Sequence, residues 1–216
     1  MKQKLPDNWI PCSDPYALLA EAAAQEEDVQ GIFFENLMLD GADYTGITFR
    51  ECRFSACKLL NCRLERTGWM DCALDRCDFS NCRMSRASIQ RVQMQHCKLM
   101  GVNLTDAFLM DVLLEDCMAG YGNFSGAKIR HTRFVRTDLS SGSLNNCQLN
   151  HVTMEQCRLN GAELFGTAFQ GMDLSNCEIG GISIGGQELR GATVNLLQAA
   201  QLGQLLAGVK LSRDDL

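Results

Sequence analysis

Residues 72–86 read CALDRCDFSNCRMSR, and they hold a period of five residues. The large apolar residues Leu74, Phe79 and Met84 lie five apart, and each follows a small residue by two positions. The same phase continues without a break over residues 34–194, where every fifth residue is apolar although only 46% of the chain is apolar. Such a period indicates a repeated structural unit rather than an accident of composition.

A period of five fits neither regular element, because an amphipathic helix needs apolar spacing near 3.6 and a strand needs 2. The position two residues before each large apolar residue prefers small side chains, such as Cys62, Cys77 and Ala107. One large and one small residue of every five therefore point inward, and the other three point outward. Short extended steps joined by turns satisfy this pattern when four steps make a square coil of about 20 residues that pairs with the coils above and below.

Several units resemble the pentapeptide-repeat family, whose repeat orders a small residue, Asp or Asn, Leu or Phe, Ser, Thr or Arg, and Gly or a polar residue. Good matches lie at residues 42–46, 77–81, 102–106, 122–126, 137–141, 162–166 and 172–176. The resemblance covers roughly three quarters of the chain. It implies an all-β solenoid, a right-handed quadrilateral β-helix, for which the period predicts about eight coils.

The two ends of the chain follow a different pattern, which predicts short helical caps at both ends. Residues 13–24 read SDPYALLAEAAA, in which a polar capping pair and a proline precede strong helix formers. This helix should cover the first coil, whose backbone edge would otherwise recruit another chain. We therefore expect an N-terminal segment with a capping helix (1–28), the β-helix (29–194), and a C-terminal helix with its tail (195–216).

The C-terminal helix has more apolar surface than one capping face needs. The excess predicts a homodimer interface, and the alternative is a cap that is buried on most of its sides. The segment also resembles the C-terminal capping helix of pentapeptide-repeat proteins such as the Qnr quinolone-resistance proteins, which dimerise there. The expected interface residues are Leu202, Leu205, Leu206 and Val209.

Eleven of the twelve cysteines occupy the small inward position, and only Cys12 lies outside the repeats. We expect these eleven side chains to be compact and buried, with slow thiol chemistry, because a thiol in apolar surroundings is inert. The coil spacing falls within the Cα range of a disulfide, so an occasional oxidised pair stays an alternative. The eleven are Cys52, Cys57, Cys62, Cys72, Cys77, Cys82, Cys97, Cys117, Cys147, Cys157 and Cys177.

One coil interrupts the pattern of large inward residues. Ala119 is the small exception among them, and Gly120 and Gly122 follow it closely. Missing contacts in a core weaken packing. We therefore expect the solenoid to be packed most loosely there, and Ala119→Leu to be neutral or stabilising.

No pattern of residues predicts catalysis or a cofactor. The three histidines lie in no nucleophile or metal motif, and the glycine pairs at 180–181 and 185–186 lack the strand-to-helix context of a phosphate loop. Asp111, His131 and His151 lie twenty residues apart. They should form one outward column, which is either an ordinary surface or a weak site for a divalent cation.

Charge is distributed unevenly along the chain, whose net charge is −6. Residues 50–98 carry ten Lys and Arg against five Asp and Glu, whereas residues 1–49 carry two against nine and residues 99–216 carry eight against twelve. Like charges on neighbouring strands repel each other. A cluster of four arginines on adjacent coils is therefore either a docking patch for an acidic partner or a solvated face; it consists of Arg63, Arg66, Arg83 and Arg86.

These observations favour a non-enzymatic, protein-binding scaffold of a bacterial cytosol that forms a homodimer and has an unknown protein partner. Residues 1–11 contain no apolar signal segment, and no stretch approaches the ~18 consecutive apolar residues of a membrane span. The resemblance implies an alternative function, a DNA-like protector of DNA gyrase or topoisomerase IV that gives quinolone resistance. The basic zone disfavours this alternative, because a DNA mimic should present acids to a groove lined with cations. We expect no direct contact with nucleic acid or membrane.

Overall fold

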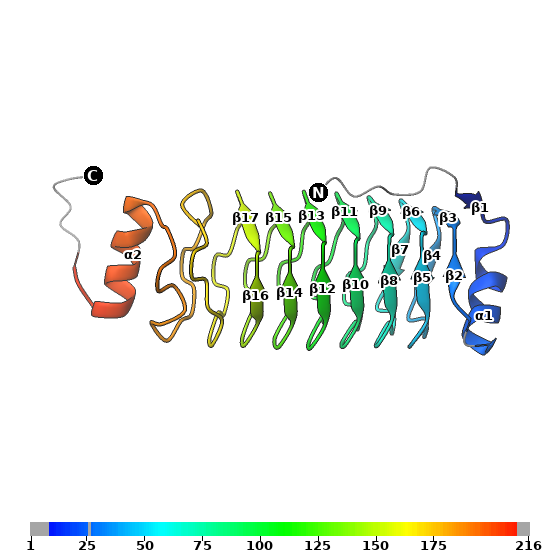
Figure 1. Ribbon diagram of the computed structural model, residues 1–216, viewed down its shortest axis with the longest axis horizontal. Helices are drawn as coiled ribbons and strands as arrows, with labels where there is room; N and C mark the ends of the chain where they lie inside the picture. The colour runs from blue at the N-terminus through cyan, green and yellow to red at the C-terminus, as the bar shows by residue number, and fades with distance from the viewer. Residues whose placement is uncertain (1–8, 26, 211–216) are drawn as a thin grey trace.

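The computed structural model describes residues 9–25 and 27–210, which form an elongated rod with a helix at each end (Figure 1). The chain advances by one coil every 20 residues, and successive coils pair in parallel and in register. Phe34 lies opposite Phe54, and Phe54 lies opposite Leu74. The chain is therefore a parallel β-solenoid, as the period of five predicts.

Two sides of the rod are parallel sheets of short strands. The eight-stranded sheet contains β1 (Ile10–Pro11), β3 (Ile32–Glu35), β6 (Arg53–Ser55), β9 (Ala73–Asp75), β11 (Gln93–Gln95), β13 (Leu113–Glu115), β15 (Arg133–Val135) and β17 (Thr153–Glu155). The seven-stranded sheet contains β2 (Val29–Gln30), β5 (Thr48–Arg50), β8 (Gly68–Met70), β10 (Ser88–Gln90), β12 (Phe108–Met110), β14 (Lys128–Arg130) and β16 (Gln148–Asn150).

The other two sides are held mainly by isolated β-bridges. One begins as β4 (Met38–Asp40) and β7 (Lys58–Leu60) and continues as bridges as far as Arg158–Glu178. The other, which we call the bridge side, runs from Asp43–Arg63 to Glu163–Ser183. Four sides make the predicted square coil. Bridges carry the register on to Asp173–Thr193, and the solenoid has about seven turns, one fewer than the expected eight.

The large inward residues stack in columns along one continuous core. Near the N-terminal end these residues are aromatic: the rings of Phe34 and Phe54 stack with centroids 4.7 Å apart, and those of Phe49 and Trp69 lie 4.5 Å apart. Aromatic pairs at such distances add to the free energy gained by burial alone. The interior therefore confirms the predicted pairing of one large and one small inward residue.

The coil turns its corners through residues in the left-handed backbone region. Positive φ angles recur at every fifth residue over most of the solenoid, and 21 of these residues are not glycine. Left-handed backbone costs a non-glycine residue roughly 1–2 kcal/mol. The inter-coil pairing must offset this cost at each corner, and the corner side chains point away from the core.

The eleven repeat cysteines are buried and all twelve are free thiols, whereas Cys12 is only half-buried. Each of several thiols donates to a carbonyl one coil earlier, as Cys57 does to Phe34 at 3.4 Å. Thr137 replaces cysteine in this column and donates to the Leu114 carbonyl at 3.1 Å. Burial also raises the pKa of Cys147 to about 11. The small inward position therefore favours a compact donor, and not merely a compact apolar group.

The coil at Ala119 needs a glycine three residues later. A Cβ added to Gly122 would lie 2.9 Å from the Ala119 carbonyl oxygen and 3.0 Å from the Phe124 ring. Close approach of Phe124 therefore requires glycine at position 122. Loose packing beside the Ala119 side chain, and a neutral or stabilising Ala119→Leu, stay predictions.

Helix α1 (Pro15–Gln25) covers the first coil. Its N-terminus is capped by Asp14, which accepts the N–H of Ala17 at 3.0 Å. Leu19 and Ala22 are buried against the core. Helix α2 (Leu196–Ala207) covers the opposite end of the rod (Figure 1), so both predicted caps are present.

Candidate functional site

The four predicted arginines lie on two adjacent coils. Arg63 and Arg83 are bridge partners on the bridge side. Arg66 and Arg86 occupy the next corner, both with a φ of 58°. The N–H of Arg66 donates to the Ser85 carbonyl at 2.9 Å, which fixes these coils in register. The structure therefore gathers the arginines that the sequence places together.

The four arginines differ in their ion pairs. Arg63 contacts Asp43 at 3.3 Å and Glu65 at 3.6 Å. For Arg66, Arg83 and Arg86, no carboxylate within residues 9–25 and 27–210 is an ion-pair partner. These two ion pairs compensate part of the charge of Arg63, although exposed ion pairs contribute little to stability. The uncompensated charge comes from the other three arginines.

A shallow hollow of about 470 Å³ opens at this corner. Its two carboxylates are turned aside: Glu65 pairs with Arg63, and the Asp106 carboxylate lies over Gly126 one coil further on. The floor and walls otherwise offer guanidinium, hydroxyl and amide groups. The lining residues are Glu65, Arg66, Ser85, Arg86, Asn103, Thr105 and Asp106.

A local hydrogen-bond pattern explains why this corner differs from others. Where Asp or Asn precedes the large inward residue, its side chain accepts from the residue two positions later. Asp78 accepts the N–H of Ser80 at 3.0 Å and its hydroxyl at 2.6 Å. Asn103 accepts the same two groups of Thr105 at the same distances. Such turns satisfy a backbone donor within one repeat.

Arg83 stands where Asp78 and Asn103 stand in their own repeats, and arginine supplies no acceptor. In the part of the chain that the structure describes, neither the N–H nor the hydroxyl of Ser85 has a hydrogen-bond partner. Ser85 lines the hollow between Arg66 and Arg86. Two neutral donors and two cationic side chains thus converge on one place.

Helix α2 is anchored by polar contacts as well as by Leu202. Asn195 and Gln198 form a reciprocal capping box. Gln198 is the buried residue of the helix, and its side-chain amide donates to the carbonyls of Leu174 at 2.9 Å and Cys177 at 2.6 Å. These bonds satisfy carbonyls of the last coils that no further coil pairs with.

Helix α2 keeps several large apolar side chains exposed. Leu205, Leu206 and Val209 from the predicted interface are about half exposed, whereas Leu202 is partly buried against the core. Leu202 therefore contributes to the cap, and its part in the expected interface stays a prediction. Leu196 is 89% exposed and Leu197 is 57% exposed, and the sequence reading did not include them. These exposed residues do not share one face, because at 3.6 residues per turn Leu196 and Leu205 point in opposite directions, as do Leu197 and Leu206. The exposed apolar residues on and after α2 are Leu196, Leu197, Leu205, Leu206 and Val209.

The predicted Asp111–His131–His151 column exists, and its two imidazoles stack with centroids 4.9 Å apart at 16°. Among the residues that the structure describes, no three His, Cys, Asp or Glu side chains lie close enough together to hold a metal ion. Parallel rings at this separation also point their nitrogens side by side rather than toward one point. The column offers no support for a cation site.

Another corner carries a charge network that sequence reasoning missed. His96 lies 3.2 Å from Asp75 and 3.9 Å from Asp116. Arg136 pairs with Asp116 at 2.7 Å and with Glu115 at 2.8 Å, which lowers the pKa of Asp116. The twenty-residue spacing of His96, Asp116 and Arg136 could have revealed this column. Its charges largely compensate each other, unlike those around the hollow.

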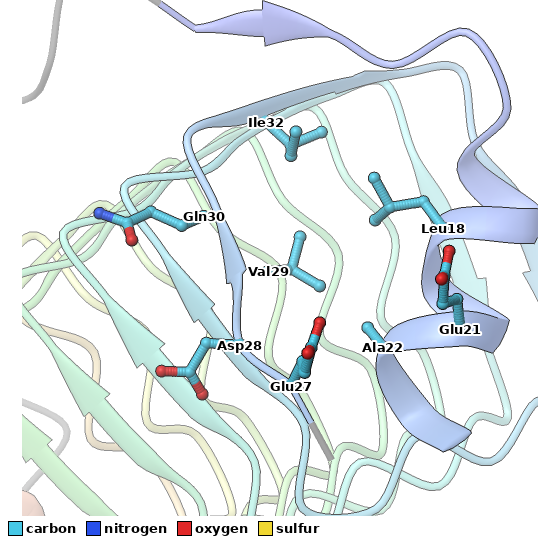
Figure 2. A pocket seen from close by; sticks show the side chains of 8 residues that line it. All are labelled: Leu18, Glu21, Ala22, Glu27, Asp28, Val29, Gln30 and Ile32. Carbon is cyan, nitrogen blue, oxygen red and sulfur yellow. The ribbon is translucent and has the colours of Figure 1, made fainter. Parts of the chain in front are cut away.

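A hollow of about 310 Å³ lies between α1 and the first strands (Figure 2). Leu18 and Ala22 of α1 face Val29 and Ile32 across it, with Glu27 at its edge. Apolar side chains on both walls are typical of a seam where a capping helix meets its coil. We assign it to packing of the cap.

Two family models match the chain: a pentapeptide repeat region over residues 67–142 and pentapeptide repeats over residues 143–179. The chain belongs to the pentapeptide-repeat family. The two models are contiguous over residues 67–179 and include Arg83 and Arg86 but not Arg63 or Arg66, and they agree with the repeat phase and the four-sided coil.

Solved structures of the family are similar to this chain at low identity. A trypsin-treated variant of QnrB1, a plasmid-mediated fluoroquinolone resistance protein, is 19% identical over 86% of this chain and 100% of its own, with a TM-score of 0.43. HetL from the cyanobacterium Nostoc sp., described as involved in heterocyst differentiation regulation, is 19% identical over 82% and 95%, with a TM-score of 0.34. No curated protein matches the chain.

Proposed function

We propose that the protein is a non-enzymatic, protein-binding scaffold of a bacterial cytosol that forms a homodimer through α2. The observation that carries this proposal is the set of exposed apolar side chains on and after α2, which remain exposed although the helix is already anchored by Gln198 and Leu202. A capping role alone needs only the inner face. Neither helix in the described residues has the length and apolar character needed to cross a membrane.

The composition of α2 suits contact with a second copy of the chain. Residues 196–207 read LLQAAQLGQLLA and contain no charged residue, so two such helices can pack together without burying an unpaired charge. Large exposed apolar side chains that gather on one element mark interaction sites. Pairing at α2 would join two rods at their C-terminal ends and leave the four long sides of each available to partners.

Sedimentation velocity at micromolar concentration tests the dimer. The wild type should sediment as a dimer, and Leu205→Lys with Leu206→Lys should sediment as a folded monomer. Met38→Lys is the matched control, because Met38 is an exposed apolar residue at the other end of the rod. A wild type that is monomeric under these conditions would contradict the proposal, and so would a double variant that stays dimeric.

The alternative function is protection of a type II topoisomerase from quinolones. Arg66, Arg83 and Arg86 argue against it, because they would bring uncompensated positive charge into a groove adapted to phosphates. We therefore rank it below the scaffold, whose partner should instead carry negative charge.

A further inference from the structure

We propose that the hollow beside Arg83 binds an acidic segment of a partner protein, one of whose carboxylates accepts the N–H and hydroxyl of Ser85 while Arg66 and Arg86 pair with the segment's charges. This inference names the chemistry of a partner of the scaffold and so rests on the function proposed above. It does not depend on the dimer, because the hollow is formed by a single chain.

The protein itself shows what ligand these donors take. In repeats that carry aspartate, the carboxylate accepts from the residue two positions later, at 3.1 Å from Thr45 to Asp43 and at 2.9 Å from Ser175 to Asp173. Hydrogen bonds from these partners lower the pKa of both aspartates, so the donors favour the ionised carboxylate. Ser85 offers the same pair of donors without an internal acceptor.

The surrounding charges select an anion. Arg66 and Arg86 lie one coil apart, about 4.8 Å, on the wall of the hollow. Each guanidinium can form a bidentate pair with a carboxylate, and charge-assisted hydrogen bonds are the stronger ones. Glu65 and Asp106 also line the hollow, but within the described residues neither forms an ion pair with Arg66 or Arg86, since Glu65 pairs with Arg63 and the Asp106 carboxylate lies over Gly126. A segment with several neighbouring acids therefore fits better than a single acid.

Carboxylate is favoured over phosphoryl because the internal model is an aspartate in the same turn. One carboxylate oxygen takes both donors in the Asp78 turn, and that geometry is set by the backbone rather than by a pocket for a tetrahedral group. At Ser85 the partner's carboxylate therefore takes the place that an aspartate side chain occupies in repeats such as those of Asp43 and Asp78.

The experiment measures binding of a fluorescently labelled hexa-aspartate peptide by anisotropy at about 0.15 M salt, with hexa-asparagine as the uncharged control. The full-length wild type should bind hexa-aspartate and not hexa-asparagine. Arg86→Gln should weaken binding about tenfold, the usual scale for a hydrogen bond to a charged group. Arg76→Gln removes an equal charge half a coil away and should change affinity less than about twofold, because salt screens distant charges.

A charge-matched pair of variants separates the Ser85 donors from general electrostatics. Arg83→Gln and Arg83→Asn both remove one positive charge, but only asparagine can accept from Ser85 as Asn103 accepts from Thr105. Arg83→Asn should therefore bind hexa-aspartate about tenfold more weakly than Arg83→Gln. The peptide should shift the Ser85 amide resonance in the wild type and leave it unchanged in Arg83→Asn.

Three results would overturn the inference: equal affinities of the two Arg83 variants, an unmoved Ser85 resonance in the wild type, or an equal loss in Arg76→Gln. Tighter binding of a phosphoserine hexapeptide than of hexa-aspartate would reject carboxylate as the ligand. A monomeric protein that still binds hexa-aspartate in this way would remove the dimer and leave the acidic docking site intact.

Discussion

The coils at the two ends of the rod share one period but are held together differently. The N-terminal coils contain the aromatic stack of Phe34, Phe49, Phe54 and Trp69, and their backbone forms regular strands. In the described part of the solenoid, strands end at β17, and residues 156–194 contain eight glycines. There, polar anchors add to a core that still buries residues such as Leu164 and Phe169. The comparison teaches that the period determines the path of the chain, while its stability is set locally by what fills each position.

Glu188 is the main anchor of the C-terminal coils. Its carboxylate accepts the backbone N–H of Gly185 at 3.0 Å, Gly186 at 2.9 Å, Gln187 at 3.0 Å and Gly166 at 3.1 Å. Burial raises the pKa of Glu188, but these hydrogen bonds together lower it by more, so the pKa lies below its ordinary value. Successive N–H groups that surround one anion form a nest. In this coil the protein's own side chain occupies the nest.

The largest effect should come from the aromatic stack. Trp69→Ala removes contacts with Phe49, Phe54 and Phe79 and leaves the Thr67 hydroxyl without its indole donor, so it should destabilise the protein by about 3–5 kcal/mol. Urea unfolding followed by circular dichroism measures the loss. Phe165→Ala is the control, because Phe165 is 46% exposed and lies in the C-terminal coils. Similar losses in both variants would contradict a difference between the two ends.

A smaller and more local effect is expected at Glu188. Glu188→Gln should cost about 1–3 kcal/mol, because a neutral amide is a weaker acceptor for four N–H groups. Hydrogen exchange should show faster opening of residues 165–207 and unchanged protection of residues 30–95. Uniform loss of protection along the rod would indicate that the C-terminal coils are not a separate unit.

The same carboxylate gives the sign of a pH dependence. Because the pKa of Glu188 is lower in the folded protein, its stabilisation is fully present above the unfolded pKa of about 4.3 and is lost as pH falls through the folded value. Protection of residues 165–207 should therefore fall at acid pH before that of residues 30–95. The Glu188→Gln variant should lack this step.

The rates of thiol labelling should also differ between the N-terminal and C-terminal coils, but by less. Cys12 should react quickly with a thiol reagent under native conditions, and the eleven buried cysteines should react slowly. Among the slow thiols, Cys177 and Cys147 should react first, because they are 6% and 5% exposed and lie toward the less tightly packed end. Mass spectrometry of digested samples follows each site. Rapid labelling of Cys52 or Cys72 would contradict tight packing of the N-terminal coils.

The smallest effect should be seen with gyrase. Protection of supercoiling from ciprofloxacin should be weak or absent, because the N-terminal coils that would enter a DNA groove carry Arg66, Arg83 and Arg86 without carboxylate partners among the described residues. Replacing these three with glutamate should increase protection if charge is the limitation. Robust rescue by sub-micromolar wild type would place the topoisomerase function first.

The fold could be predicted from sequence because each five-residue unit repeats one inward pattern, and the structure buries nearly all of the large inward residues from Phe34 to Ile179 as expected. Grouping of the four arginines followed from the same arithmetic. The corners could not be predicted in this way. Arg66, Arg86 and Tyr121 adopt left-handed backbone that their own preferences disfavour, because pairing between coils overrides local propensity.

What sequence arithmetic missed are the places where a side chain departs from its column. Glu188 should point outward by its position, yet it is 8% exposed because four backbone donors draw it in. Leu202 and Leu205 are equally apolar, and only the orientation of α2 on the last coil separates cap from exposed face. The donors of Ser85 became visible only when the turns of Asp78 and Asn103 were known.

The twenty-residue register makes the residue count a measure of both distance and direction. Inserting five residues between the arginine hollow and α2 would rotate the helix by about a quarter turn around the rod, whereas inserting twenty would move it about 4.8 Å farther away with no rotation. An insertion whose length is not a multiple of five would turn inward residues outward. Insertion of single repeats therefore changes the relative orientation of two surfaces on the rod, and insertion of whole coils changes the distance between them.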